Sequence, residues 1–457
     1  MEIKAPAVAG KKEISFSNRE LVALILPLLL EQLLAITVGL ADSLMVATVG
    51  DAAISAVSLV DSISNLMIYI FSAMAAGGAA VAGQYIGRRE KENACAAGQH
   101  LVVLLAVTSA LFTALLYLFK PLVLTTVFGR IDADVMAATD KYYSIVVASI
   151  PGIALYNGGA AIFRTMGRSD MSLKVSLLMN AINVGGNALL IFGFHMDVAG
   201  VAIPTLAART VAAAVILGLL FNQKLPLHLS NVRSFRLNRR LLRNILYIGI
   251  PSGMENGMFQ LGRLALFSLV STFGTASIVA NAIGNTLGNF HCVAGQAMGL
   301  GLGTVTSQCV GAGDFDAARY YMRKLTKVSY ALMGSINLLL IALLPLIMRI
   351  YDVSPEAERL AVPVALVHGI ASIFLWIPSF LIPAFLRASG DARFTMIASM
   401  LTMWLCRVLF AYVFGKWMGF GVIGVWVAHA ILDWSVRSIV FFLRYRSGKW
   451  TTKAIRG

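Results

Sequence analysis

Long apolar runs of about 20 residues follow one another along the whole chain, separated by short polar or basic segments. An α-helix needs about 20 apolar residues to cross the hydrocarbon core of a bilayer. Only 13% of the residues are charged, about half the share found in soluble domains. The chain could not cover itself with a water-exposed surface, so the pattern predicts an all-α polytopic membrane protein.

The apolar runs predict twelve transmembrane helices. A membrane β-barrel is disfavoured, because its strands would show an alternation of apolar and polar residues that this sequence lacks. The predicted helices cover residues 20–47, 53–83, 95–119, 138–163, 171–193, 198–222, 244–272, 276–306, 319–348, 360–385, 394–415 and 421–443.

The basic residues predict how the chain is oriented in the membrane. If the N-terminus is cytoplasmic, 27 of the 37 Lys and Arg residues fall in cytoplasmic segments and 6 in external ones. This bias is the positive-inside pattern of membrane proteins. We therefore expect a multi-pass protein of the plasma (cell) membrane with both termini in the cytoplasm. The net charge of +15 then faces anionic lipid and does not indicate a nucleic-acid partner.

The two halves of the sequence match each other at a constant offset. Pro27 corresponds to Pro251, and Gly87 corresponds to Gly311. Duplication of a six-helix unit predicts two bundles related by an axis along the membrane normal, with a ligand site between them near the midplane. The predicted domains are an N-terminal lobe (1–223), a basic cytoplasmic linker (224–243), a C-terminal lobe (244–443) and a cytoplasmic tail (444–457).

Proline occurs at equivalent points early in the first predicted helix of each half. A proline inside a helix removes one backbone hydrogen bond and permits a bend. We therefore predict that Pro27 and Pro251 act as hinges.

Acidic residues inside the predicted spans are the strongest indication of function. Each costs about 2.5–3.5 kcal/mol at the centre of a bilayer, so it is expected to face the protein interior or a wet cleft. Glu31 and Asp42 are eleven residues apart, close to three helical turns, and share one helix face. The set is Glu31, Asp42, Asp61, Glu255 and Asp433.

Asparagines lie at helical spacing in several predicted spans. Amides often hydrogen-bond between membrane helices, and this structural role stays open beside a functional one. For Asp42 and the asparagine face of residues 171–193, which carries Asn180, Asn183 and Asn187, we favour function. The predicted lining of a substrate cavity is Glu31, Asp61, Asn65, Glu255, Asn281, Asn285 and Asn289.

Arginines within the spans predict local neutralisation of some acids. Arg437 follows Asp433 by one helical turn, so these two residues are expected to form a pair. Arg407 has no acid nearby in its own span, and it could neutralise an acid on another helix.

The other reactive residue types indicate no metal, cofactor or catalytic site. The four Cys lack CxxC spacing, and the six His lack ligand spacing. The glycine-rich stretch 295–303 lies in an apolar run without a following Lys-Ser/Thr, so it is not a phosphate-binding loop. We expect a protein that is not an enzyme.

Short motifs in the chain follow the pattern of a known family. They are Pro27-Leu-Leu-Leu-Glu-Gln, Gly39-Leu-Ala-Asp42-Ser-Leu-Met-Val, Gln84-Tyr-Ile-Gly87, Arg164-Thr-Met-Gly167, Asn183-x3-Asn187 ahead of Leu-Ile-Phe-Gly193, and Gly200-Val-Ala. These motifs resemble the multidrug and toxic compound extrusion (MATE) family over nearly the whole chain. The resemblance implies twelve helices in two six-helix lobes around a V-shaped cavity, and drug efflux coupled to inward movement of H⁺ or Na⁺.

The resemblance also implies roles for particular residues. Asp42 matches the family's acid for cation coupling, and Asn183 and Asn187 match the pair that closes around it in the proton-coupled type. The second position of that pair is often Asp, so Asn187 leaves Asp42 as the main titrating group. The Na⁺-coupled type has acids in its seventh and tenth helices, whereas residues 360–387 contain none. H⁺ is therefore favoured over Na⁺.

We predict a secondary active transporter that exports cationic amphipathic drugs or toxic organic cations by antiport through alternating access. A flippase for lipid-linked precursors of the same superfamily is the alternative. A channel fits less well because the repeat gives two lobes and no filter-like segment, and a membrane enzyme fits less well because the sequence shows no catalytic cluster. The expected partners are organic cations, H⁺ or Na⁺, and membrane lipids. One chain with two lobes suffices for alternating access, so we expect a monomer.

Overall fold

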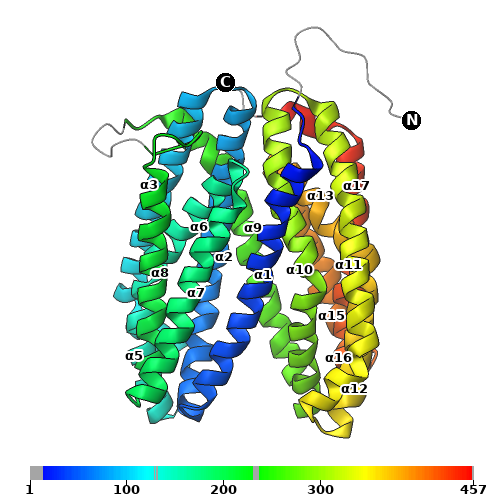
Figure 1. The fold of residues 1–457 in the computed structure, drawn as a ribbon. Helices are drawn as coiled ribbons and strands as arrows, with labels where there is room; N and C mark the ends of the chain where they lie inside the picture. The colour runs from blue at the N-terminus through cyan, green and yellow to red at the C-terminus, as the bar shows by residue number, and fades with distance from the viewer. Residues whose placement is uncertain (1–13, 128, 130–131, 230–235, 455–457) are drawn as a thin grey trace. The chain divides into compact units, whose positions relative to one another are not determined.

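The computed structural model describes residues 14–127, 129, 132–229 and 236–454, and they are almost entirely helical (Figure 1). No strand occurs among these described residues. Ten helical spans are long and apolar enough to cross a membrane. Two further helices, α9 (Arg239–Ser271) and α10 (Thr275–Gly311), occupy the positions of the other two predicted spans. The structure therefore confirms an all-α polytopic membrane protein.

The first half of the chain forms helices close to the predicted spans. The predicted helix 138–163 is divided at Ser149, because Pro151 follows at the start of the next helix and cannot donate a backbone hydrogen bond. The elements are α1 (Asn18–Ala47), α2 (Asp51–Gly87), α3 (Lys91–Leu118), α4 (Lys120–Leu122), the π-helical η1 (Val123–Val127), α5 (Ala133–Ala148), α6 (Ile150–Thr165), α7 (Ser169–Ala188), π-helical η2 (Leu189–Gly193) and α8 (Ala199–Leu220).

The second half repeats this order, with more π-helical segments inside its spans. After α9 and α10 come α11 (Phe315–Tyr351), α12 (Pro355–Ala371), η4 (Ser372–Trp376), α13 (Ile377–Ala388), α14 (Ala392–Leu401), η5 (Thr402–Val408), α15 (Leu409–Ala411), η6 (Tyr412–Trp417), α16 (Gly421–Val427), η7 (Ala428–Asp433), α17 (Trp434–Arg446) and the short 3₁₀ helix η8 (Lys449–Lys453).

Equivalent helices of the two halves have matching ends. Helix α2 runs from Asp51 to Gly87 and α10 from Thr275 to Gly311, so both ends are displaced by the offset that relates Pro27 to Pro251. The ends of α1 and α9, at Ala47 and Ser271, are separated by the same offset. The helix boundaries thus follow the repeat found in the sequence.

The chain divides into two compact units. The N-terminal unit comprises Leu26–Ala79 and Ala96–Arg263, and the C-terminal unit comprises Met1–Ile25, Ala80–Cys95 and Leu264–Gly457. Helix α1 contributes to both units, and its division falls between Ile25 and Leu26, immediately before Pro27. The predicted hinge therefore lies where α1 passes from one unit to the other.

Within the C-terminal unit, the ends of α2 and α10 cross with their backbones in contact. A Cβ atom added to Gly87 would lie 2.0 Å from the carbonyl oxygen of Gln308, and one added to Gly311 would lie 2.0 Å from that of Gln84. These four residues are related in pairs by the sequence repeat. The crossing requires a residue without a side chain at both glycines, which explains why both halves have glycine there.

Segments near the two ends of the described chain pack on the beginning of α11 in the C-terminal unit. The Tyr321 hydroxyl lies 2.6 Å from the backbone nitrogen of Phe16, and the two rings are in edge contact. Trp450 packs against Phe315 and lies under the Arg319 guanidinium. Both segments therefore lie on the same side of this unit, as an even number of spans requires.

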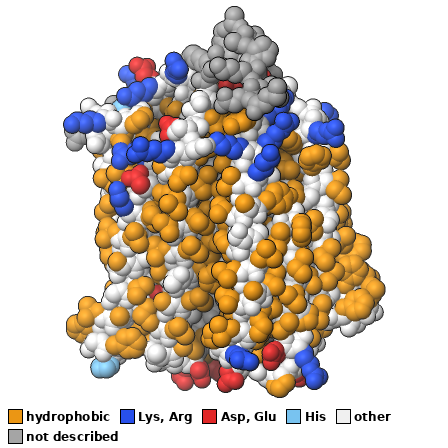
Figure 2. All heavy atoms as spheres, turned by 45° about the vertical axis from the view of Figure 1, so that its right-hand side comes forward, with side chains coloured by type: hydrophobic (Ala, Val, Ile, Leu, Met, Phe, Trp, Pro, Cys, Tyr) orange, Lys and Arg blue, Asp and Glu red, His pale blue; other side chains and the backbone are white. Residues whose placement is uncertain are grey.

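Charged side chains gather at the edges of the face drawn in Figure 2, and hydrophobic side chains cover its middle. Lys and Arg side chains are concentrated along the upper edge of that view. An apolar band of this kind suits the hydrocarbon layer of a membrane, while the charged edges suit the lipid headgroups and water.

Candidate functional site

Asp42 lies in the N-terminal unit beside the asparagine face of α7. The Asn187 side-chain amide donates to Asp42 Oδ1 at 2.9 Å. Asn187 is fully buried and Asn183 nearly so, whereas Asp42 is partly exposed. Although Asp42 and Asn187 are far apart in the sequence, the structure brings them together in one polar site.

The amide of Asn183 can be oriented in two ways beside Asp42. With its nitrogen toward the carboxylate, it lies 2.9 Å from Oδ2, and its oxygen lies 3.1 Å from the Thr205 hydroxyl. With its oxygen toward Asp42, its nitrogen donates to Thr205 Oγ1 at 3.1 Å. The first orientation fits an ionised carboxylate, which accepts hydrogen bonds. The second fits a protonated carboxyl, which can donate one to the amide oxygen.

The side-chain oxygen of Asn187 is an unsatisfied hydrogen-bond acceptor at this site. Its Oδ1 atom is buried and has no hydrogen-bond partner among the described residues. A buried acceptor without a partner costs about 1–3 kcal/mol.

A second carboxylate and an arginine complete what we call the Asp42 cluster. The Tyr142 hydroxyl donates to Asp61 Oδ1 at 3.4 Å, and Arg209 interacts electrostatically with both Asp61 and Asp42. The Arg209 guanidinium donates to Ser149 Oγ at 2.8 Å and to Ser64 Oγ at 3.3 Å. The cluster comprises Asp42, Asp61, Tyr142, Asn183, Asn187, Thr205 and Arg209.

Sequence reasoning missed three members of this cluster, namely Tyr142, Thr205 and Arg209. Arg209 was noticeable as a charge inside a predicted span, but nothing in its own helix indicated a partner. The α8 and α5 side chains reach Asp42 and Asp61 only through packing of distant segments. A search for intramembrane arginines together with acids, regardless of separation, would have found Arg209.

The two glutamates predicted to line a substrate cavity are both buried in the N-terminal unit. Glu31 accepts from the Ser172 hydroxyl at 2.9 Å and from the Tyr156 hydroxyl at 3.2 Å, and Arg164 lies 3.8 Å away. Glu255 is 4% exposed. Glu31 is therefore held by partners of its own, separately from Asp42.

The predicted asparagine columns have mixed environments. Asn65 and Asn289 are exposed. Asn281 accepts from the Trp426 indole at 3.1 Å, and the Asn285 amide donates to the Asn281 backbone oxygen at 2.9 Å. The contacts of Asn281 and Asn285 are those expected of amides that stabilise helix packing.

Asp433 is neutralised from another helix, by the arginine that was expected to be able to act in this way. Asp433 is paired with Arg407 of η5, whose Nε and Nη2 atoms lie 2.8 Å and 2.5 Å from Oδ2. The Arg437 guanidinium lies over the Phe380 ring, 4.6 Å from its centroid. Arg407 presents two nitrogens to one carboxylate oxygen from a neighbouring helix, which is a charge-assisted hydrogen-bond geometry.

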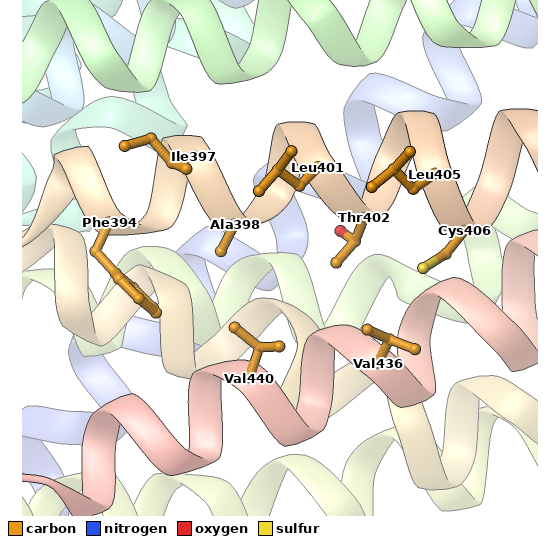
Figure 3. Close-up of a pocket in the computed structure, with 9 residues that line it drawn as sticks. All are labelled: Phe394, Ile397, Ala398, Leu401, Thr402, Leu405, Cys406, Val436 and Val440. Carbon is orange, nitrogen blue, oxygen red and sulfur yellow. The ribbon is translucent and has the colours of Figure 1, made fainter.

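The apolar pocket between α14, η5 and α17 offers nothing for a charged ligand (Figure 3). Its lining side chains are Phe394, Ile397, Ala398, Leu401, Thr402, Leu405, Cys406, Val436 and Val440. No group of three or more His, Cys, Asp or Glu residues able to hold a metal ion occurs in the described ranges. The Asp42 cluster is therefore the candidate site.

Repeated membrane helices and a buried polar cluster define a polytopic membrane transporter with an internal duplication. The family model MatE matches residues 27–189 and 251–413, two segments of equal length that begin at the equivalent prolines Pro27 and Pro251. The chain belongs to the MatE family, as the resemblance of its motifs implied. The two matches also confirm the predicted repeat.

Individual relatives match this chain along nearly their whole lengths. It is 28% identical to the uncharacterized transporter YisQ of Bacillus subtilis, over 99% of this chain and 98% of YisQ. It is 23% identical to the probable multidrug resistance protein NorM of Thermotoga maritima, over 97% and 96% of the two chains. A crystal structure of MATE in complex with MaL6 matches with a TM-score of 0.88 at 18% identity, over 95% of this chain and 97% of that chain. The fold is therefore confirmed.

Proposed function

We propose that this protein is a multidrug efflux transporter that exports cationic amphipathic compounds in exchange for a cation, with H⁺ preferred to Na⁺. The observation that carries the proposal is the carboxylate of Asp42 held between two buried amides in the N-terminal unit. Similarity to the NorM protein supports drugs as the substrate class.

The hydrogen bonds around Asp42 favour a proton as the coupling ion. When Asp42 is protonated, it can donate to the Asn183 oxygen, the Asn183 nitrogen then donates to Thr205, and Thr205 donates to the Val201 backbone oxygen at 2.9 Å. When Asp42 is ionised, both amides can turn a nitrogen toward it. The amides of Asn183 and Asn187 can thus hydrogen-bond to the Asp42 carboxyl whether it is protonated or ionised.

Protonation of Asp42 would drive alternating access by changing these contacts on one face of α1. The hinge at Pro27, where α1 passes between the two units, would let the helix bend while its ends remain packed, and Pro251 would serve α9 in the same way.

The proposed substrate-binding residues remain those predicted from the sequence, namely Glu31, Asp61, Asn65, Glu255, Asn281, Asn285 and Asn289. The predicted lobes, residues 1–223 and 244–443, remain the proposed moving parts, and residues 224–243 join them. We propose that the protein acts as a monomer in the plasma membrane, with both termini in the cytoplasm.

The alternative function, a flippase for lipid-linked precursors, is less well supported. Such precursors carry phosphate groups, so a site for them requires positive charge. The Asp42 cluster contains two carboxylates and one arginine, and Glu31 and Glu255 add further acids. These groups favour organic cations.

Efflux driven by separate ion gradients tests the proposed function. Purified protein would be reconstituted in vesicles of phosphatidylethanolamine and phosphatidylglycerol, and efflux of the cationic dye ethidium measured under an imposed pH gradient or an imposed Na⁺ gradient. We expect the pH gradient to drive efflux and the Na⁺ gradient to have little effect at equal pH. Efflux that responds to neither gradient would refute antiport, and a response to Na⁺ alone would refute proton coupling.

A further inference from the structure

An apolar groove runs along the surface of the C-terminal unit, between α14 with η5 on one side and α17 on the other (Figure 3). The small side chains of Ala398, Thr402 and Cys406 face Val436 and Val440 across it and leave a volume of about 330 Å³. The Thr402 hydroxyl already donates to a backbone oxygen of the preceding turn, at 3.2 Å. The groove therefore suits a hydrocarbon chain.

The groove opens toward the lipid. Ile397, Leu401 and Leu405 form its outer rim at intervals of four residues, and each is more than half exposed. From Phe394 to Leu405 the lining spans about 16 Å at the α-helical rise. The hydrocarbon region of one leaflet is about 15 Å deep, half that of the whole bilayer core. The length of the groove thus matches an acyl chain lying along the protein in a single leaflet.

An arginine continues each wall of the groove. Arg393 precedes Ile397 by four residues, and Arg444 follows Val440 by four, so each lies on the same helix face as groove-lining side chains. The Arg444 guanidinium lies over the ring of Phe394, 4.6 Å from its centroid, and this contact places it at the mouth of the groove. The Arg393 side chain is exposed.

Asp391 brings the two arginines to the same end of the groove. It precedes Arg393 by two residues, and its carboxylate accepts from Arg444 Nε at 2.7 Å and from Nη2 at 3.1 Å. Asp391 and Arg444 neutralise each other, so Arg393 supplies the net positive charge of the three residues. A guanidinium has five N–H donors, and these two bonds do not use all of them. Positive charge and N–H donors at the end of an apolar groove suit a phosphate that carries a hydrocarbon chain.

We propose that this groove binds an anionic phospholipid, with one acyl chain in the groove and the phosphate at Arg393 and Arg444. The backbone of Lys453 lies against Gly390 beside the mouth, so the mouth is at the end of the unit where the C-terminal segment packs. The proposed topology assigns this end to the cytoplasmic leaflet, which is rich in anionic lipid. The site is separate from the Asp42 cluster, and the inference does not depend on antiport.

Lipid retention by the full-length protein tests the inference. The protein would be purified in detergent and incubated with equal amounts of phosphatidylglycerol and phosphatidylcholine that have the same acyl chains, and the bound lipids would be counted by native mass spectrometry. We expect the wild type to retain phosphatidylglycerol in preference, because the choline ammonium cancels the phosphate charge. Arg393→Gln should retain both lipids equally. Leu401→Trp, which fills the groove, should lose both.

Two matched variants control for charge and for size. Arg446→Gln removes the same charge from the end of α17, but Arg446 is two residues from Arg444 and therefore lies on another face of the helix. Leu338→Trp introduces the same ring at an exposed position of α11, outside the groove. Both control variants should retain phosphatidylglycerol as the wild type does.

Several results would overturn the inference. Equal retention of the two lipids by the wild type is one, and a loss in Arg446→Gln as large as in Arg393→Gln is another, because it would show general attraction to a basic surface. Unchanged lipid retention in Leu401→Trp would place the lipid elsewhere, and loss of ethidium binding in that variant alone would show that the groove takes a drug. Should either Arg393→Gln or Leu401→Trp not fold, the other decides the outcome.

Discussion

Asp42→Asn is expected to abolish efflux driven by a cation gradient while leaving the folded protein intact. Asparagine has nearly the same shape as aspartate and can still hydrogen-bond to the amides of α7, but it cannot bind and release a proton. Without a titrating carboxyl at this position, a pH gradient has no group on which to act. We therefore expect ethidium efflux under a pH gradient to fall to the rate seen in vesicles without protein.

A matched control is available in the same unit. Asp170 is partly exposed and is paired with Lys174 at 3.2 Å, and it lies at the beginning of α7. Asp170→Asn should retain the wild-type efflux rate and thermal unfolding midpoint. Gradient-driven efflux in Asp42→Asn at the wild-type rate would show that this carboxyl does not couple the cation.

Asp433→Asn is expected to have the largest effect on stability. The Asp433 side chain is fully buried and that of Arg407 is 5% exposed, so the variant would leave the guanidinium buried without its counter-charge. Breaking a buried pair in this way costs about 3–5 kcal/mol. We expect the thermal unfolding midpoint in detergent to fall clearly, with little change for Asp316→Asn, which removes an exposed ion pair with Arg319.

A double variant distinguishes the missing charge from a general loss of packing. Asp433→Leu/Arg407→Met removes both charges of this pair, and replacing a buried pair by apolar side chains is often neutral or stabilising. The double variant should therefore unfold at a higher temperature than Asp433→Asn. Equal midpoints for Asp433→Asn and the wild type would show that the pair contributes nothing to stability.

Much of the fold could be predicted because membrane helices have simple local signals. Apolar length located the spans, and the constant offset between the two halves was visible in pairs such as Pro27 and Pro251. Helix ends were predicted less well, since the spans expected at 53–83 and 276–306 continue to Gly87 and Gly311. The division of the predicted helix 138–163 at Ser149 is the clearest difference, and the signal for it was Pro151.

Pairings between distant helices could not be predicted in the same way. Spacing along one helix indicated Arg437 as a partner of Asp433, but it could not show that a neighbouring span supplies Arg407 to the same carboxylate. Arg209 was likewise left without a role, because its contacts with Ser64 and Ser149 depend on how three helices pack. By contrast, Asp42 with the asparagine face of α7 was identified through family motifs, which carry information on contacts that spacing alone lacks.

The most direct test of the central proposal is to measure the proton that Asp42 exchanges when a drug binds. Ethidium would be added to purified protein in weakly buffered detergent solution, and proton release followed with a pH indicator from about pH 5 to about pH 8. The account predicts that wild-type protein releases about one proton per bound dye over part of this range. It also predicts that Asp42→Asn binds the dye without releasing a proton. Equal proton release by both proteins, or dye binding by the wild type without any release, would contradict it.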